Sequence, residues 1–207
     1  DRDFSVSLMD YIRSRHLPDF DTVNGLSEFR RFMVLAFDGS IAKPDALRLF
    51  LDSAGIMDPE VRADLIRKEL EYSQRICLFP TEKETLLELA QRGFALGMIT
   101  NSFQSAAEKA SWFGALGLGC IAQTVVSSID AGVSKPDPGI YLEFARRIGS
   151  TPGEIAFVGH EAFELAGARA AGMIPVSFNC SPEIRENLHL GVFSDLLAMF
   201  PAPGSTP

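Results

Sequence analysis

Three short polar segments in the second half of the chain contain residue types that can bind and transfer an anionic group. The first segment, Thr100, Asn101 and Ser102, directly follows the apolar run FALGMI. Hydroxyl groups and backbone N–H groups at the start of a helix suit an anion such as phosphate. The same residue types are also the usual helix N-caps, so this segment alone leaves a purely structural role open.

The second segment is VSKPDPGIY, which contains Lys135. Pro136 and Pro138 restrict the backbone on either side of Asp137, so the ammonium group is carried on a stiff loop. A lysine in this position can neutralise a phosphate or the carboxylate that attacks it. The alternative is a solvated surface lysine, which is the commonest environment for this residue type.

The third segment, IAFVGHEAFELAGARAAGM, contains His160, Glu161 and Glu164. His160 and Glu164 are four residues apart and would share one face of a helix that begins this early. Carboxylate oxygens are the ligands that Mg²⁺ prefers, so the segment is a candidate metal site. The alternative is a helix cap with solvated glutamates and a structural histidine.

The apolar pattern around these segments predicts alternating strands and helices after residue 80. Helices are expected at 81–92, 103–116, 138–148, 162–171 and 194–200, and strands at 94–99, 121–127, 155–158, 174–178 and 190–193. This alternation predicts a parallel sheet with helices on both faces. Ligands of such sheets bind beyond the carboxyl ends of the strands, where the three polar segments begin.

Residues 1–80 show only helical patterns and are expected to form a separate helical domain before the α/β domain of residues 81–207. Helices are predicted at 5–17 and 24–37, with further helices that begin at Pro44 and at Pro59, the latter capped by Asp58. Breaks in the helical pattern are expected near Gly25 and near Gly39.

Composition and charge exclude several classes of function. The chain has 207 residues, of which 46% are hydrophobic, and a net charge of −8. The negative charge argues against nucleic acid or an anionic membrane surface as the main partner. No apolar stretch is long enough to span a membrane. The cysteines Cys77, Cys120 and Cys180 lie far apart, which indicates reduced thiols and a cytoplasmic location. The oligomeric state stays open.

The segments ALGMITNS, SKPDPGIY and FVGHEAFELAGARAAGM, in this order and spacing, resemble the second, third and fourth motifs of the haloacid dehalogenase-like (HAD) hydrolase superfamily. The helical segment before them resembles the cap of that superfamily. The resemblance covers essentially the whole chain and implies a doubly wound parallel-sheet HAD-like core with an N-terminal all-helical cap. The phosphatase-like branch with a helical cap is the most similar.

What the resemblance implies is hydrolysis of a small phosphorylated substrate through an aspartyl-phosphate, with a second Asp two residues after the nucleophile as acid and base. Thr100 corresponds to the phosphate-binding residue, with Asn101 and Ser102 as further contacts. Lys135 corresponds to the lysine that steadies the nucleophile and the phosphate.

The resemblance also implies Mg²⁺ as the cofactor, which bridges phosphate and carboxylates. His160 stands where the family has its first metal-binding Asp, and Glu164 matches the second acidic position. Neutral imidazole is a poor ligand for Mg²⁺. Metal binding is therefore expected to be weak unless Glu161 or Glu164 reaches the ion.

The opening motif of the family, a strand followed by Asp-x-Asp-x-Thr, has no clear counterpart. Asp1 and Asp3 have its spacing, but the helix predicted at 5–17 begins too soon after them, and the motif is expected upstream of residue 1. Phe37 to Ser40 also resemble part of the motif and are interpreted as a helix–turn junction. Two alternatives to a phosphatase stay open: a non-catalytic HAD-like binding protein and a 2-haloacid dehalogenase, which needs no metal.

Overall fold

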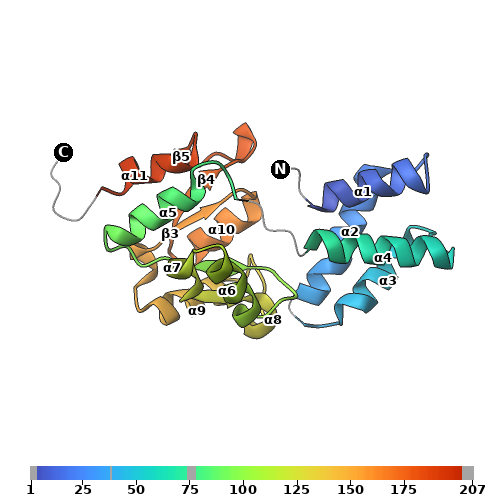
Figure 1. Ribbon diagram of the computed structural model, residues 1–207, viewed down its shortest axis with the longest axis horizontal. Helices are drawn as coiled ribbons and strands as arrows, with labels where there is room; N and C mark the ends of the chain where they lie inside the picture. The colour runs from blue at the N-terminus through green and yellow to red at the C-terminus, as the bar shows by residue number, and fades with distance from the viewer. Residues whose placement is uncertain (1–3, 38, 74–77, 202–207) are drawn as a thin grey trace. The chain divides into compact units, whose positions relative to one another are not determined.

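The computed structural model describes residues 4–37, 39–73 and 78–201, and the chain divides into two compact units (Figure 1). The first unit comprises Asp1–Cys77 and the second Leu78–Pro207. None of the described helices is long and apolar enough to cross a bilayer. Asp1, Asp3 and Asp38 lie outside the described residues.

The described part of the first unit is built from helices, drawn in blue to blue-green in Figure 1. They are α1 (Phe4–Arg15), α2 (Thr22–Phe37), α3 (Lys43–Ser53) and α4 (Pro59–Ser73). Their apolar faces pack on one another, with Ile12, Phe50 and Leu65 at most 1% exposed. The rings of Phe29 and Phe50 meet edge to face, with centroids 5.2 Å apart.

Capping confirms one predicted helix start in this unit, and the break expected near Gly25 lies between the end of α1 and the start of α2. Asp58 Oδ1 accepts hydrogen bonds from the backbone N–H groups of Glu60 and Val61, so it caps α4. Gly25 itself lies buried near the start of α2. A Cβ at this position would lie 2.4 Å from Cζ of Phe20, so the glycine is explained by close packing.

The second unit alternates helices and parallel strands, as the sequence predicts. Its helices are α5 (Glu82–Gln91), α6 (Ala106–Ala115), α7 (Gly119–Ala122), α8 (Ser128–Ala131), α9 (Pro138–Ile148), α10 (Ala162–Ala170) and α11 (Leu196–Met199), with short 3-10 turns at Pro152–Glu154, Pro182–Ile184 and Phe193–Asp195. Its strands are β1 (Met98–Thr100), β2 (Val125–Ser127), β3 (Ala156–Gly159), β4 (Ile174–Phe178) and β5 (Leu188–Leu190).

Three predicted strands of this unit need correction. The strand expected at 94–99 comprises only Met98–Thr100, so Thr100 is its last residue. The run at 121–127 is a strand only from Val125, because Gly119–Ala122 form the helical turn α7. Ile121 and Leu118 are both buried three residues apart, which suits a helical turn, and a short apolar run does not distinguish the two structures. The last strand lies at 188–190, not 190–193, because Phe193–Asp195 form a 3-10 turn.

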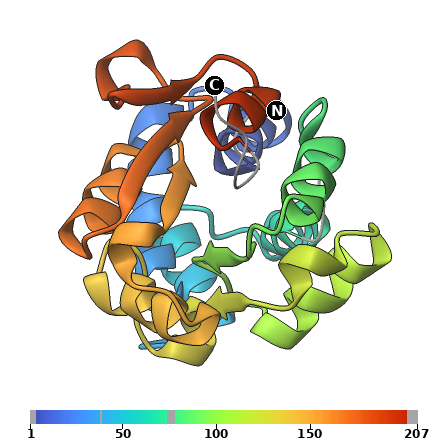
Figure 2. The same cartoon turned by 90° about the vertical axis from the view of Figure 1, so that its left-hand side faces the viewer.

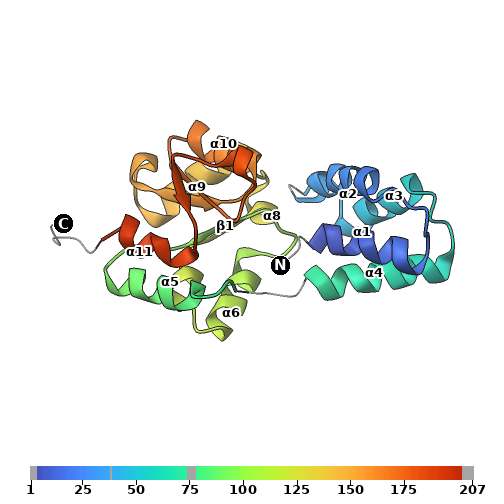
Figure 3. The same ribbon diagram turned by 90° about the horizontal axis from the view of Figure 1, so that it is seen from above.

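The strands form two parallel ladders, in which β1 pairs with β2 and β4 lies between β3 and β5. Figure 2 shows the orange strands β3 and β4 side by side. Helices cover both faces of the strands (Figure 3), which confirms the doubly wound architecture. α9 packs on β1 and β2, and α10 packs on β3 and β4.

Strands β1 and β3 border the same two apolar cores but are not hydrogen-bonded to each other. Met98 of β1 and Val158 of β3 pack against the core beneath α5. Ile99 of β1 and Phe157 of β3 pack against the core beneath α9 and α10. Among the described strands, β1 pairs only with β2 and β3 only with β4. Within the described residues, each of these two strands therefore has one edge without a partner strand.

Candidate active site

Asn101 joins the first polar segment to the second. β1 ends at Thr100, which is half-buried and lies opposite Ser127 of β2. The side-chain amide of the next residue, Asn101, donates to the carbonyl oxygen of Lys135 at 3.0 Å. It also accepts a hydrogen bond from the backbone N–H of Lys135 at 2.8 Å. This pair of bonds fixes the backbone of Lys135 against the end of β1.

The ammonium group of Lys135 joins the second segment to the third. Nζ lies 2.5 Å from Oε1 of Glu164, and each of the two side chains is only 10% exposed. Nζ also lies 5.9 Å from the ring centroid of Phe157. All three polar segments are thus connected through one lysine at the carboxyl ends of the strands.

Tyr141 and Gly167 allow helix α10 to approach the loop of Lys135. The buried hydroxyl group of Tyr141 donates to the backbone carbonyl of Glu164 at 2.8 Å. A Cβ at position 167 would lie 2.6 Å from the carbonyl oxygen of Pro136 and 2.8 Å from Oη of Tyr141. Sequence analysis missed both residues. Their only sequence signals were the inward-facing pattern of helix 138–148 and the small residues of AGARAAG.

Glu164 is held in its charged form despite its burial. Burial by itself would raise the pKa of this carboxyl group. The adjacent ammonium group of Lys135 and the nearby His160 together outweigh burial and lower the pKa below its usual range. For Tyr141, burial and the charge of Glu164 raise the pKa of the phenol, so Tyr141 stays a neutral donor.

His160 and Glu161 lie at the start of α10, where the sequence predicts metal ligands. The side chain of His160 is 59% exposed, and its Nδ1 lies 3.7 Å from Oε2 of Glu164. Glu161 is the N-cap residue of α10. Within residues 4–37, 39–73 and 78–201, no group of three or more His, Cys, Asp or Glu side chains could hold a metal ion. With Glu164 paired to an ammonium group, these residues do not fit Mg²⁺ without further carboxylates.

Ser102 makes its hydrogen bonds within and next to the loop that follows β1. Its hydroxyl donates to Oε1 of Gln104 at 2.7 Å and accepts from the backbone N–H of Gln104 at 3.1 Å. Its own backbone N–H donates to Oγ of Ser128 at 2.9 Å. Since the residue is only 4% exposed, a phosphate contact from its hydroxyl stays a prediction that would require these bonds to rearrange.

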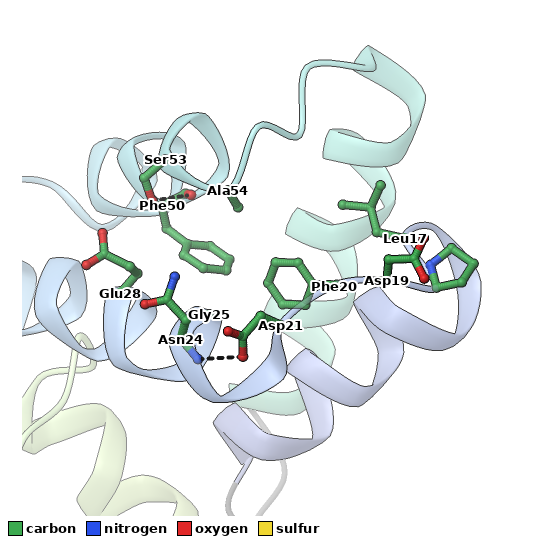
Figure 4. A pocket seen from close by; sticks show the side chains of 11 residues that line it. Leu17, Asp19, Phe20, Asp21, Asn24, Gly25, Glu28, Phe50, Ser53 and Ala54 are labelled. Carbon is green, nitrogen blue, oxygen red and sulfur yellow. Dashed lines mark hydrogen bonds between the residues drawn. The ribbon is translucent and has the colours of Figure 1, made fainter.

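The helical unit contains a cavity of its own, of about 420 Å³ (Figure 4). The rings of Phe20 and Phe50 lie in its lining, and its ionisable lining residues are Asp19, Asp21 and Glu28. Asp21 Oδ1 accepts hydrogen bonds from the backbone N–H groups of the first turn of α2. Because every ionisable lining group is acidic, this cavity is not a candidate for a phosphorylated ligand.

Comparison with known proteins shows to which protein family the chain belongs. The family model for haloacid dehalogenase-like hydrolases matches residues 19–172. The chain therefore belongs to the haloacid dehalogenase-like hydrolase family, as the three sequence motifs indicate.

Individual relatives have two kinds of activity. A glyceraldehyde 3-phosphate phosphatase of Methanopyrus kandleri is 36% identical over 99 residues, which are 47% of this chain and 42% of that protein. An (S)-2-haloacid dehalogenase 4A of Burkholderia cepacia is 30% identical over 123 residues, 58% of this chain and 51% of that one. The chain thus spans about half the length of these relatives. The crystal structure of a dehalogenase shares the fold, with a TM-score of 0.69 and 20% identity over 96% of this chain and 91% of that chain.

Proposed function

We propose that this protein hydrolyses a small phosphorylated metabolite and that Lys135 neutralises the transferred phosphate. The observation that supports this role most directly is the position of the Lys135 ammonium group. Its backbone is held by Asn101, and its Nζ lies 2.5 Å from Glu164 with little solvent access. A fixed cation in a poorly solvated site stabilises developing negative charge without reorganisation during the reaction.

Thr100 would add a hydroxyl donor to the same phosphate. It is adjacent to Asn101, whose amide binds the backbone of Lys135, so residues 100 and 135 lie on neighbouring segments. In the absence of a bound anion, Glu164 balances the charge of Lys135. An incoming phosphate would share the ammonium group with this carboxylate.

The nucleophilic aspartate of this reaction would come from a further parallel strand between β1 and β3. Both strands have an edge without a partner strand among the described residues and contribute side chains to the same two cores, one on each face. A strand between them would be apolar on both faces, as central parallel strands are. Its carboxyl end would lie next to the segments that carry Thr100 and Lys135.

The helical unit would serve as the cap that selects the substrate and excludes water, as the family resemblance implies. Mg²⁺ would be the cofactor of a phosphatase of this family, and carboxylates of the additional strand would have to complete its ligands. The cytoplasmic location expected from the scattered cysteines stays a prediction.

A second candidate function is hydrolysis of a carbon–halogen bond in a 2-haloacid. The residues at the expected metal site favour this reaction because it needs no metal. His160 occupies the position of a metal-binding Asp, and Glu164 is paired with Lys135. An aspartate nucleophile and a lysine suffice for that reaction, and a relative with 30% identity is a 2-haloacid dehalogenase.

The two activities are separated by assays on the full-length protein. Release of phosphate from an aryl phosphate, with and without Mg²⁺, is compared with halide release from 2-chloropropionate in the presence of a chelator. The Lys135→Ala variant is expected to lose at least about 100-fold in rate. The control Lys109→Ala changes a lysine of α6 whose Nζ lies 4.8 Å from the centroid of the Trp112 ring, and its rate should be unaffected.

Mg²⁺-dependent phosphate release that Lys135→Ala abolishes would support the phosphatase. Metal-independent halide release would support the second candidate instead. Absence of turnover on both substrates, together with thermal stabilisation by phosphate, would contradict both activities and indicate a binding protein.

A further inference from the structure

A second cavity, of about 440 Å³, lies in the α/β unit beyond the ends of β4 and β5. Its lining comes from the segment before α5, the loop after β4 and the turn after β5. Neither Thr100, Lys135 nor Glu164 belongs to this lining. The cavity is large enough for a small organic ligand and is separate from the proposed phosphate site.

Among the described residues that line this cavity, Arg185 and His189 have basic side chains, and none has a carboxylate. Arg185 is exposed and makes no ion pair with any residue that the structure describes. His189 Nδ1 lies 3.0 Å from Oγ of Ser177, which leaves Nε2 as the ring atom that can reach a ligand. In a chain with a net charge of −8, this is an unusual local arrangement.

Carboxylates that are near in sequence are committed to other partners. For Glu183, a hydrogen bond from the side chain of Ser181 lowers the pKa of the carboxyl group. Glu82 accepts a hydrogen bond from the backbone N–H of Phe79 at 2.7 Å. Glu186 pairs with Arg169. Asp195 accepts from the backbone N–H groups of Gly191 and Val192 at 2.8 and 3.0 Å. The charge of Arg185 is therefore available to an external anion.

One wall of the cavity is aromatic. The rings of Phe79 and Phe178 lie edge to face with centroids 5.1 Å apart, and those of Phe178 and Phe193 at 5.3 Å. Phe79 is 36% exposed, and Val192 in the same lining is 57% exposed. Apolar surface next to a guanidinium group suits a ligand with an anionic head and an apolar or aromatic body.

Two residues of the lining adopt a left-handed backbone. Thr81 has φ 63° and Asn179 has φ 49°, and within the described residues these are the only non-glycine positions with positive φ. This conformation is unfavourable for a β-branched residue such as Thr81. Left-handed non-glycine residues concentrate at ligand sites, and here both line one cavity.

We propose that this cavity binds a small organic anion, with Arg185 and His189 at its head group and the phenylalanine rings around its apolar body. Phosphate, phosphonate and carboxylate heads share the required chemistry. The site is distinct from the Lys135 site, so its occupancy does not depend on the proposed hydrolysis.

Isothermal titration calorimetry of the full-length protein with phenylphosphonate tests this proposal, since its carbon–phosphorus bond resists hydrolysis by a phosphatase. Benzoate tests a carboxylate head, methylphosphonate lacks the ring and benzyl alcohol lacks the charge. Arg185→Gln is expected to weaken phenylphosphonate binding about tenfold or more. Arg146→Gln is the matched control, because Arg146 is 71% exposed and pairs with Glu143 on its own helix.

We expect phenylphosphonate, benzoate or both to bind the wild type and Lys135→Ala. Their affinity should be unchanged in Arg146→Gln. Methylphosphonate and benzyl alcohol should bind the wild type more weakly than the aryl anions. The tighter of the two aryl anions identifies the preferred head group. Three outcomes would overturn the proposal: no saturable binding of either anion, equal affinity in Arg185→Gln, or loss of binding in Lys135→Ala. The last would assign the ligand to the other site.

Discussion

Each unit of the protein contains a lysine–glutamate pair with little solvent access, and the two pairs differ in the charge that burial allows. In the helical unit, Lys43 Nζ lies 2.8 Å from Oε1 of Glu69, which is 1% exposed. In the α/β unit, Lys135 Nζ lies 2.5 Å from Oε1 of Glu164, and both side chains are 10% exposed. By distance alone, the two ion pairs would be equivalent.

The pKa values of the two carboxyl groups shift in opposite directions. Burial raises the pKa of Glu69, and Lys43 only partly offsets it. In the described part of the chain, neither oxygen of Glu69 has a hydrogen bond of normal geometry. The pKa of Glu164 is lowered because Lys135 and His160 together outweigh burial. The carboxyl group of Glu164 is therefore ionised more readily than that of Glu69, although both carboxyl groups are buried beside a lysine.

Replacement of each lysine in turn by methionine should have the largest effect on stability and turnover, and the two variants should differ most clearly in turnover. Lys135→Met leaves Glu164 buried without its main partner, which should lower the free energy of unfolding by about 3 kcal/mol. It should also reduce turnover about 10²- to 10³-fold. Lys43→Met should destabilise the protein too but leave turnover within about twofold of the wild type per unit of folded protein.

Urea unfolding and initial rates measure these two effects. Equal loss of turnover in both variants would remove the functional distinction between the pairs.

The hydrogen bonds around each lysine provide a second, smaller test. Lys43 is the first residue of α3, whereas the backbone of Lys135 is held on a loop by Asn101. Asn101→Ala removes both bonds and should cost about 1–2 kcal/mol of stability. Turnover should fall about 10- to 100-fold because the ammonium group is no longer positioned.

Asn101→Asp keeps the acceptor for the N–H of Lys135 but not the donor for its carbonyl oxygen, so its turnover should lie between those of the wild type and Asn101→Ala. Loss of stability without loss of turnover would show that Asn101 is only structural.

The smallest expected effect concerns the free energy of unfolding, whose dependence on pH should differ between the variants Glu164→Gln and Glu69→Gln. The lowered pKa of Glu164 contributes stability that is present above its unfolded-state pKa and lost as pH falls through the folded-state value. The raised pKa of Glu69 contributes stability that is present below its unfolded-state pKa and lost as pH rises through the folded-state value.

The destabilisation caused by Glu164→Gln should therefore shrink toward acid pH, and that caused by Glu69→Gln should shrink toward neutral pH. Chemical unfolding of both variants from pH 3.5 to 7.5 measures the two slopes. Slopes of the same sign would contradict the assignment of opposite pKa shifts.

Periodicity and capping signals predict much of the fold. Helix 138–148 and strand 174–178 have the predicted bounds, and Asp137 caps the helix by accepting from the N–H of Gly139. The local patterns did not explain those residue choices that tertiary packing decides. Gly25 suits the interior of α2 only because of the adjacent ring of Phe20, which the pattern around Gly25 does not reveal.

For the candidate site, the sequence predicted the segments but not their connections. Motif spacing identified Lys135 and Glu164, which the structure brings into contact. The roles of Tyr141 and Gly167 depend on contacts between residues more than twenty positions apart. The cavity of Arg185 was missed for the same reason, since its lining joins residues from 79 to 194.

The edges of β1 and β3 that have no partner strand within the described residues also bear on how the protein is handled. Unpaired strand edges are templates on which other extended chains can add, including those of neighbouring molecules. The side chains of these strands are apolar on both faces, as Ile99 and Val158 illustrate, and an edge left without a partner strand would favour self-association in concentrated solution. A strand that occupies the space between them would therefore protect the protein from aggregation as well as contribute to its chemistry.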